Sequence, residues 1–113
     1  MRKLAIRSAL IALLLASGFA LAQKTTTKTL QGKVFGSGDA PLSGAIVYLE
    51  DGKTNNIRSF ISTSDGSYRF GQLSTDTDYQ VWARFKDQKS ATKPISSYDS
   101  RTNVTIDLHI KAK

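Results

Sequence analysis

The fold is decided by residues 63–73, which have the sequence Thr-Ser-Asp-Gly-Ser-Tyr-Arg-Phe-Gly-Gln-Leu. Asp65 and Gly66 predict a turn, because Asp bonds to its own backbone and Gly tolerates a positive φ. Tyr68 and Phe70 then alternate with polar residues, which predicts a short strand with one aromatic and one polar face. This stretch therefore indicates a half-buried β-strand that follows a tight turn.

The same alternation recurs along the chain, and turn residues separate the segments that show it. Further strands are expected at residues 30–34, 45–49, 57–63, 79–86 and 104–111. Residues 87–101 are the least regular part, where a short strand near Ala91 is considered and a break is expected at Pro94. Because nothing between the N-terminal segment and the C-terminus has helical periodicity, we predict an all-β, antiparallel Greek-key β-sandwich of about seven strands.

The alternation also predicts which side chains face the core. The twelve inward residues are expected to be Leu30, Val34, Ala45, Val47, Leu49, Tyr68, Phe70, Tyr79, Val81, Val104, Ile106 and Leu108.

The N-terminal segment has the three parts of a secretory signal peptide. Arg2, Lys3 and Arg7 form a basic start, residues 9–16 are apolar, and residues 20–22, Ala-Leu-Ala, offer small residues at the spacing that a signal peptidase reads. A membrane anchor is the alternative, but the apolar run is shorter than the ~20 residues that span a bilayer. We therefore expect cleavage after Ala22, export of the chain, and no stable membrane insertion afterwards.

The domain organisation follows from this cleavage. Residues 1–22 form the signal peptide, residues 23–28 a flexible polar leader, and residues 29–113 one small β-sandwich domain. The periplasm is the expected compartment, and secretion is the alternative. The chain has no cysteine, which excludes disulfides, thiol chemistry and an acylated-cysteine anchor.

The charge pattern bears on partners. The net charge of the whole chain is +7, and three of the positive charges lie in the signal segment. The remaining Lys and Arg residues are scattered along the chain, so nucleic acid is not an expected partner.

Three segments together resemble a known family. They are Leu-Gln-Gly-Lys-Val at 30–34, Pro-Leu-Ser-Gly-Ala-Ile-Val-Tyr-Leu at 41–49, and Ser-Asp-Gly-Ser-Tyr-Arg-Phe-Gly-Gln-Leu at 64–73, followed by Tyr-Gln-Val at 79–81. The chain is similar to the carboxypeptidase regulatory-like domain, a transthyretin-like β-sandwich. The resemblance implies a non-catalytic module. Domains of this family accompany exported enzymes and outer-membrane receptors. They are grouped with carbohydrate-binding-like folds.

No catalytic, cofactor or metal site is predicted. His109 is the only histidine, and it alternates outward in the last strand beside Asp107, so a surface position is expected. A small hydrolase is the less favoured alternative, since nothing marks a nucleophile or a shaped pocket. Asp76 and Asp78 are spaced like part of a calcium loop, but a calcium site needs about six oxygens.

Two covalent possibilities are weaker. Asn103 begins a glycosylation triplet, although a bacterial-type signal makes its use doubtful. Lys33, Glu50 and Asn103 offer the groups for a lysine–asparagine cross-link like those in adhesin sandwiches. That chemistry needs a buried lysine, and Lys33 is expected to face outward.

One surface patch is predicted from side chains that point away from the core. Trp82 is outward by parity, as are Ile46 and Tyr48 on the second strand, and the resembled fold implies that the two strands lie close together. With Arg84 they would form an exposed patch that binds an envelope protein or, alternatively, a glycan. A third possibility is that residues 87–101 fold over this patch and bury it. The oligomeric state is left open.

Overall fold

The computed structural model describes residues 27–111 of the 113-residue chain, and the predicted signal peptide lies outside them. The strands are β1 (Lys28–Phe35), β2 (Ile46–Asp51), β3 (Ile57–Ile61), β4 (Ser67–Leu73), β5 (Tyr79–Phe85), β6 (Gln88–Lys89), β7 (Lys93–Ile95), β8 (Asn103–Thr105) and β9 (Leu108–His109). A short 3₁₀ helix, η1 (Ser37–Asp39), follows β1. The described chain thus has nine strands, rather than the predicted seven or so.

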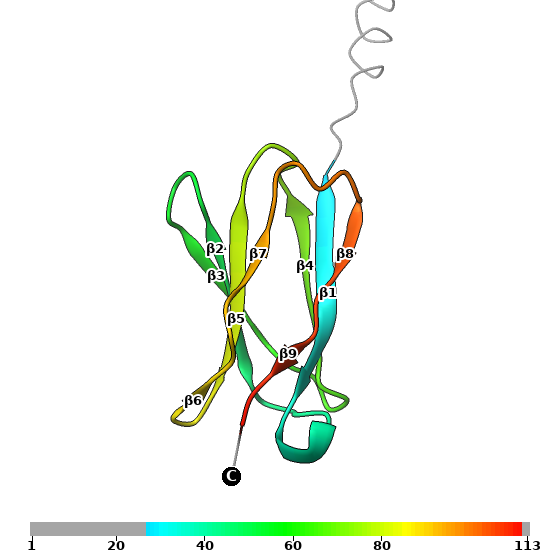
Figure 1. Cartoon of the computed structure of the whole chain (residues 1–113), viewed down its shortest axis with the longest axis vertical. Helices are drawn as coiled ribbons and strands as arrows, with labels where there is room; N and C mark the ends of the chain where they lie inside the picture. The colour runs from blue at the N-terminus through cyan, green and yellow to red at the C-terminus, as the bar shows by residue number, and fades with distance from the viewer. Residues whose placement is uncertain (1–26, 112–113) are drawn as a thin grey trace, which may run out of the picture.

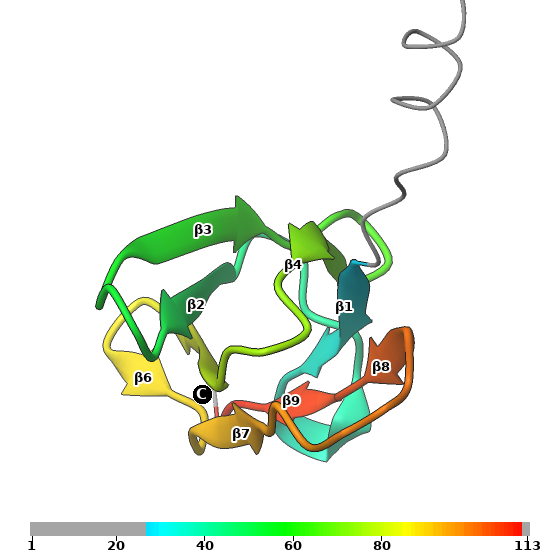
Figure 2. The same ribbon diagram turned by 90° about the horizontal axis from the view of Figure 1, so that it is seen from above.

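The strands form two sheets packed face to face, which confirms the predicted all-β sandwich (Figures 1 and 2). One sheet has the order β4-β1-β8, with β9 also on β1. The other has the order β3-β2-β5-β6, with β7 also on β5. Seen from above, β7 and β9 lie along one flank of the sandwich, while β3 and β4 lie along the opposite flank (Figure 2).

The expectation of a purely antiparallel fold is wrong at one place. Strand β1 pairs in parallel with β8 and with β9, whereas every other strand pair among residues 27–111 is antiparallel. The predicted last strand is also interrupted between Thr105 and Leu108. At this interruption the carboxylate of Asp107 accepts a hydrogen bond from the backbone N–H of Lys33, with 3.0 Å between the nitrogen and Oδ1.

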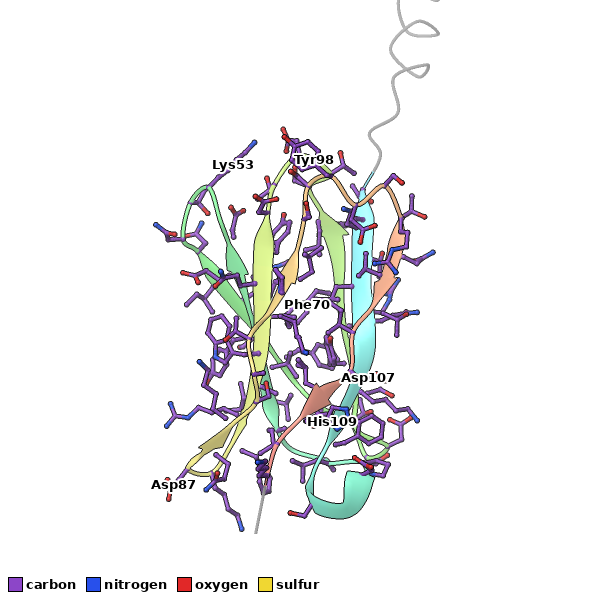
Figure 3. The ribbon with its side chains drawn as sticks, viewed as in Figure 1. Lys53, Phe70, Asp87, Tyr98, Asp107 and His109 are labelled. Atoms are coloured by element: carbon purple, nitrogen blue, oxygen red, sulfur yellow. The ribbon has the colours of Figure 1, made fainter. Side chains whose placement is uncertain are left out.

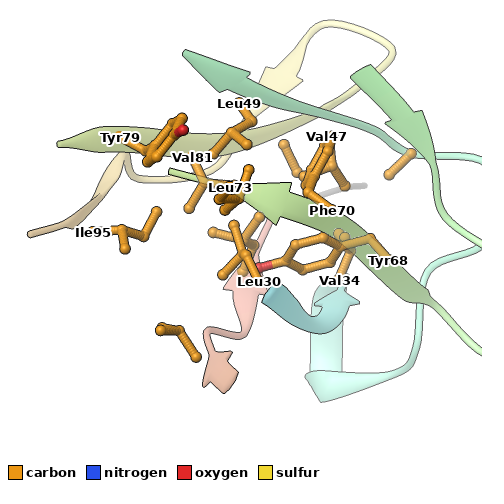
Figure 4. Packing of buried hydrophobic residues seen from close by; sticks show 14 of the residues in the cluster. Leu30, Val34, Val47, Leu49, Tyr68, Phe70, Leu73, Tyr79, Val81 and Ile95 are labelled. Carbon is orange, nitrogen blue, oxygen red and sulfur yellow. The ribbon is translucent and has the colours of Figure 1, made fainter. Parts of the chain in front are cut away.

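The core lies between the sheets, and the predicted parity holds for it. Eleven of the twelve residues expected to face inward are buried, while Ile106 is partly buried and packs against them (Figure 4). Leu73, Ala83, Ile95 and Ile110 complete the buried apolar set. Within this core the Phe70 ring packs edge-on against Phe60, with ring centroids 6.2 Å apart.

Lys28 is a second correction, because it belongs to β1 and not to a flexible leader. Its side chain is buried, with 2% exposure for the residue. The ammonium donates to the carbonyl oxygens of Ser96 (3.3 Å) and Asp99 (2.6 Å) in the β7–β8 loop. A buried charge is tolerated only when it is hydrogen-bonded, so this lysine fixes the loop to the start of β1.

Candidate functional site

The register of β2 with β5 brings the four predicted patch residues together. Tyr48 lies directly opposite Trp82, and Ile46 lies directly opposite Arg84. Directly opposite residues share one face of a sheet. Their chain neighbours Val47, Leu49, Val81 and Ala83 are buried, so the four side chains face outward. We call Ile46, Tyr48, Trp82 and Arg84 the outer patch.

Two aromatic rings form the centre of the outer patch. The rings of Tyr48 and Trp82 stack with centroids 5.6 Å apart and an interplanar angle of 23°. Both side chains are partly buried, while Ile46 is 38% exposed and Arg84 is exposed. Lys89, on β6, places its Nζ 5.5 Å from the centre of the Trp82 ring. The patch is therefore an aromatic pair flanked by an aliphatic side chain and two cations.

Strand β3 extends this face with residues that the sequence analysis did not assign. Ile61 lies opposite Ile46, and Ser59 lies opposite Tyr48. Ile57 and Ile61 are 53% and 65% exposed, so three of the four exposed large hydrophobic side chains among residues 27–111 lie on this one face. The parity of residues 57–63 was ambiguous because Phe60 and Ile61 are adjacent and both apolar. In the structure Phe60 lies opposite the buried Val47, so Phe60 is on the inner face of the sheet. Ile61, the next residue, is therefore on the outer face.

The backbone of residues 87–101 does not fold over the patch, contrary to the third possibility considered above, and only the Lys89 side chain of this segment is seen to reach the Trp82 ring. They form β6 and β7, which pair with β5 at Arg84–Phe85 and Tyr79–Val81 respectively and so extend the sheet sideways. Ile95 enters the main core, and Pro94 lies within β7 instead of breaking it. Pro is tolerated there because β7 is at the edge of its sheet.

His109 occupies the surface position that parity predicted. It stacks on Phe35, with centroids 5.2 Å apart, and its Nδ1 lies 3.5 Å from Oδ1 of Asp39. Figure 3 shows His109 and Asp107 on the same side of the molecule, while Phe70 lies between the sheets.

The two aspartates of the β4–β5 loop have separate structural partners. Asp76 accepts a hydrogen bond from the Ser74 hydroxyl, which lowers the pKa of the carboxyl, and pairs with Lys53 at 3.2 Å. Asp78 accepts the backbone N–H of Ser97 at 2.6 Å, and this bond lowers the pKa of Asp78. No group of three or more His, Cys, Asp or Glu side chains within residues 27–111 is placed to hold a metal ion.

The groups considered for a covalent cross-link are not assembled. Lys33 is exposed on β1, as expected, and Asn103 is exposed on β8. Glu50 lies on β2, in the other sheet. The buried lysine of the described chain is instead Lys28, whose ammonium contacts backbone carbonyls.

A groove of about 550 Å³ is lined mainly by residues of β1 and β4, including Lys33 and Arg69. Asp107 and, from β3 of the other sheet, Phe60 also line it. None of the four residues of the outer patch lines this groove.

Comparison with known families decides the identity of the domain. The model of the carboxypeptidase regulatory-like domain matches residues 29–111. The chain belongs to this family. Comparison with curated protein sequences found no match.

Solved structures show the fold that this carboxypeptidase regulatory-like domain shares with larger proteins. It is similar to the dioxygenase domain of a dioxygenase carbohydrate-binding protein fusion from Streptomyces sp. SirexAA-E, at 15% identity and a TM-score of 0.56 over 80% of this chain and 85% of that one. It is also similar to BcpA, the major pilin subunit of Bacillus cereus, at 13% identity and a TM-score of 0.59 over 78% of this chain and 31% of that one. Catechol 1,2-dioxygenase from Acinetobacter sp. ADP1 gives 13% identity and a TM-score of 0.58 over 79% of this chain and 53% of that one.

These likenesses concern the β-sandwich alone. The chain spans about half of the catechol dioxygenase and about a third of the pilin subunit. No helix within residues 27–111 is long and apolar enough to cross a membrane.

Proposed function

We propose that this protein is an exported, non-catalytic interaction module of the cell envelope that binds a protein partner through the outer patch. The observation that carries the proposal is the stacked Tyr48–Trp82 pair on the outer face of the β3-β2-β5-β6 sheet. Trp, Tyr and Arg are the residues most enriched at the energetic centres of protein interfaces. The exposed side chains of Ile46, Ile57 and Ile61 lie on the same face of β2 and β3 as this pair, so the exposed apolar side chains are gathered on one face.

A glycan is the alternative ligand, and the ring geometry makes it the second choice. A sugar ring binds by stacking on a free aromatic face. In the outer patch the Trp82 ring already packs against Tyr48, and the ammonium of Lys89 lies over it. The aliphatic side chains of Ile46 and Ile61 beside these rings suit an apolar protein surface better than a polar saccharide.

The non-catalytic assignment rests on what the perturbed carboxylates do. The pKa of Asp65 is lowered to about 2 by hydrogen bonds from Thr63 and Ser67 within one turn. The guanidinium of Arg101 holds the pKa of Asp99 well below its usual range, again within one loop. These groups stabilise turns on the surface, whereas a catalytic site collects perturbed groups in a cleft.

The compartment rests on the sequence of residues 1–22, which lie outside the described residues. The basic, apolar and small-residue parts of this segment support export, with the periplasm favoured over secretion. The intact mass of the protein recovered from its host would show whether cleavage follows Ala22.

The binding role is tested by capture from the envelope fraction of the native host. Immobilised wild type and Trp82→Ala are compared with Gln31→Ala, which changes the outer face of the opposite sheet. The proposal predicts that one protein captured by the wild type is retained by Gln31→Ala and lost by Trp82→Ala, while all three proteins keep their thermal melts within a few degrees.

Two other results would contradict the proposal. Loss of stability in Trp82→Ala with no change in capture would make Trp82 a packing residue. Binding of the wild type to a glycan array that is abolished by Trp82→Ala and kept by Gln31→Ala would show that the outer patch binds carbohydrate instead.

A further inference from the structure

Strand β3 has a strand neighbour on one side only within the described residues, where it pairs with β2. The backbone bonds just beyond the two ends of the strand fix which groups point to the open side. Ser62 donates its N–H to Ala45 (2.8 Å), and Asp51 donates to the carbonyl of Asn56 (2.9 Å). In an antiparallel pair, alternate residues point their N–H and C=O groups toward and away from the partner strand. The even-numbered residues of this segment therefore bond to β2, and Ile57, Ser59 and Ile61 direct their backbone groups to the open edge.

The side chains at these three positions read the same in both directions: isoleucine, serine, isoleucine. A second copy of β3 laid antiparallel against the edge and centred on Ser59 would place each Ile57 opposite Ile61 of the other copy. In this register the N–H and C=O groups of all three residues find partners across the edge. Any register shifted along the strand leaves some of these groups without a partner. The edge is therefore self-complementary in both side chains and hydrogen-bonding groups.

The charges are compatible with the same register. Arg58 faces the other side of the sheet, where its guanidinium donates to the carbonyl of Gly71 (3.3 Å) and lies 5.6 Å from the centre of the Phe70 ring. Centred on Ser59, the pairing sets Arg58 opposite Phe60 of the second copy. Like charges are thus not placed directly opposite each other, which would be destabilising.

The other sheet edges are shorter or more irregular than β3. Proteins protect edges with proline, with very short strands, with irregular backbone and with charged side chains. Strand β7 contains Pro94, β6 and β9 have two residues each, β8 has three, and β4 has a positive φ of 56° at Gln72. Strand β3 has five residues, no proline and no positive φ. Its one charged side chain, Arg58, is directed to the carbonyl of Gly71 and away from the edge.

We propose that the chain forms a two-fold symmetric dimer in which the β3 strands of two copies pair antiparallel around Ser59. The two β3-β2-β5-β6 sheets then become one continuous sheet. Ile57 and Ile61 from both copies cover the seam, and the two outer patches lie on the same face. The dimer depends on the β3 edge and not on Trp82, so it stands or falls separately from the proposed binding role.

The register is tested by cysteine cross-linking, for which the natural absence of cysteine is an advantage. The protein is expressed from its full sequence, and each variant is oxidised under mild conditions. Ser59→Cys is expected to form a disulfide-linked dimer rapidly, because hydrogen-bonded opposite residues have Cα atoms about 5.5 Å apart, within the range of a disulfide. Ile57→Cys and Ile61→Cys are each expected not to form a disulfide-linked dimer alone, and to cross-link to each other when mixed.

Matched controls separate pairing from random collision. Ser100→Cys is exposed in the β7–β8 loop and should cross-link at least tenfold more slowly than Ser59→Cys. In sedimentation at micromolar to millimolar concentrations, wild type and Trp82→Ala are expected to dimerise. Ser59→Lys, which sets two ammonium groups opposite each other, is expected to remain a folded monomer by circular dichroism.

Three results would overturn the proposal. They are equal cross-linking rates for Ser59→Cys and Ser100→Cys, self-linking of Ile57→Cys as fast as that of Ser59→Cys, and a wild-type protein that is monomeric at millimolar concentration.

Discussion

Gly32 lies in β1 where the backbone of the β8–β9 connection crosses it, and replacing it by alanine is the most demanding stability test of this fold. An added Cβ would lie 1.9 Å from the carbonyl oxygen of Ile106 and 2.7 Å from its carbonyl carbon. Ordinary van der Waals contact begins at 3.4 Å. The obstacle is backbone rather than a flexible side chain, so the Ile106 segment itself must move.

The cost follows from what holds Ile106 in place. Its carbonyl accepts the Tyr68 hydroxyl at 2.6 Å, and its N–H donates to Gln31 at 2.9 Å. Overpacking costs about 1–3 kcal/mol, and each net hydrogen bond lost costs about 0.5–1.5 kcal/mol. The substitution Gly32→Ala should therefore lower the free energy of unfolding by about 2–6 kcal/mol. A small domain has a total near the low end of 5–15 kcal/mol, so most of the stability would be lost.

Urea denaturation followed by circular dichroism measures this effect, with Gly71→Ala as the matched control. Gly71 lies on the neighbouring strand β4, has no positive φ, and an added Cβ there would meet nothing within 4 Å. Gly71→Ala should change the free energy of unfolding by less than about 1 kcal/mol, in the stabilising direction. If the free energy of unfolding of Gly32→Ala is within 1 kcal/mol of the wild-type value, then Ile106 does not lie against Gly32 as described.

Three other predictions concern the core, acid stability and the outer patch. Phe70→Ala should cost about 3–5 kcal/mol in urea denaturation, because the ring is 5% exposed and a cavity would remain; a wild-type midpoint would contradict the parity assigned to β4. The pKa of Asp65 is lowered to about 2 by Thr63 and Ser67, so its stabilisation is present above the ordinary value of 3.8 and is lost as the pH falls toward 2. Asp65→Asn should therefore flatten the fall of the melting temperature between pH 4 and pH 2, and an unchanged slope would argue against those hydrogen bonds. Trp82 is the single tryptophan, and with Arg84 and Lys89 beside it iodide should quench its fluorescence more strongly than caesium; equal quenching would place the ring away from these cations.

The sequence predicted the core well because strand alternation is a local property. Parity alone placed residues such as Val47, Val81 and Leu108 inside, and all are buried. The outer patch was predicted by the same argument from Ile46 and Trp82, and the β2–β5 register places its members side by side.

Contacts between residues far apart in the sequence could not be predicted from the alternation of apolar and polar residues. Lys28 lies in a polar, Thr-rich stretch, and its burial depends on two carbonyl groups that are 68 and 71 residues away. The parallel pairing of β1 with β8 and β9 has no local signature either. The alternation of Val104, Ile106 and Leu108 continues through the break that Asp107 makes by bonding to Lys33.

The strands within residues 87–101 were not predicted, for a related reason. Their strands have two and three residues, too few for a pattern to emerge, and they exist because β5 offers an edge to pair with. The exposed isoleucines of β3 were missed because adjacent apolar residues hide the parity, which only the pairing with β2 resolves.

Site-specific photo-crosslinking in the native host tests the central claim most directly. A photoreactive phenylalanine analogue is placed at position 84 in the outer patch or at position 69, which is exposed on the opposite sheet. The proposed function predicts one discrete adduct with an envelope protein from position 84, none from position 69, and loss of the adduct when Trp82→Ala is added. The same adducts from both positions, or an adduct from position 84 that survives Trp82→Ala, would contradict it.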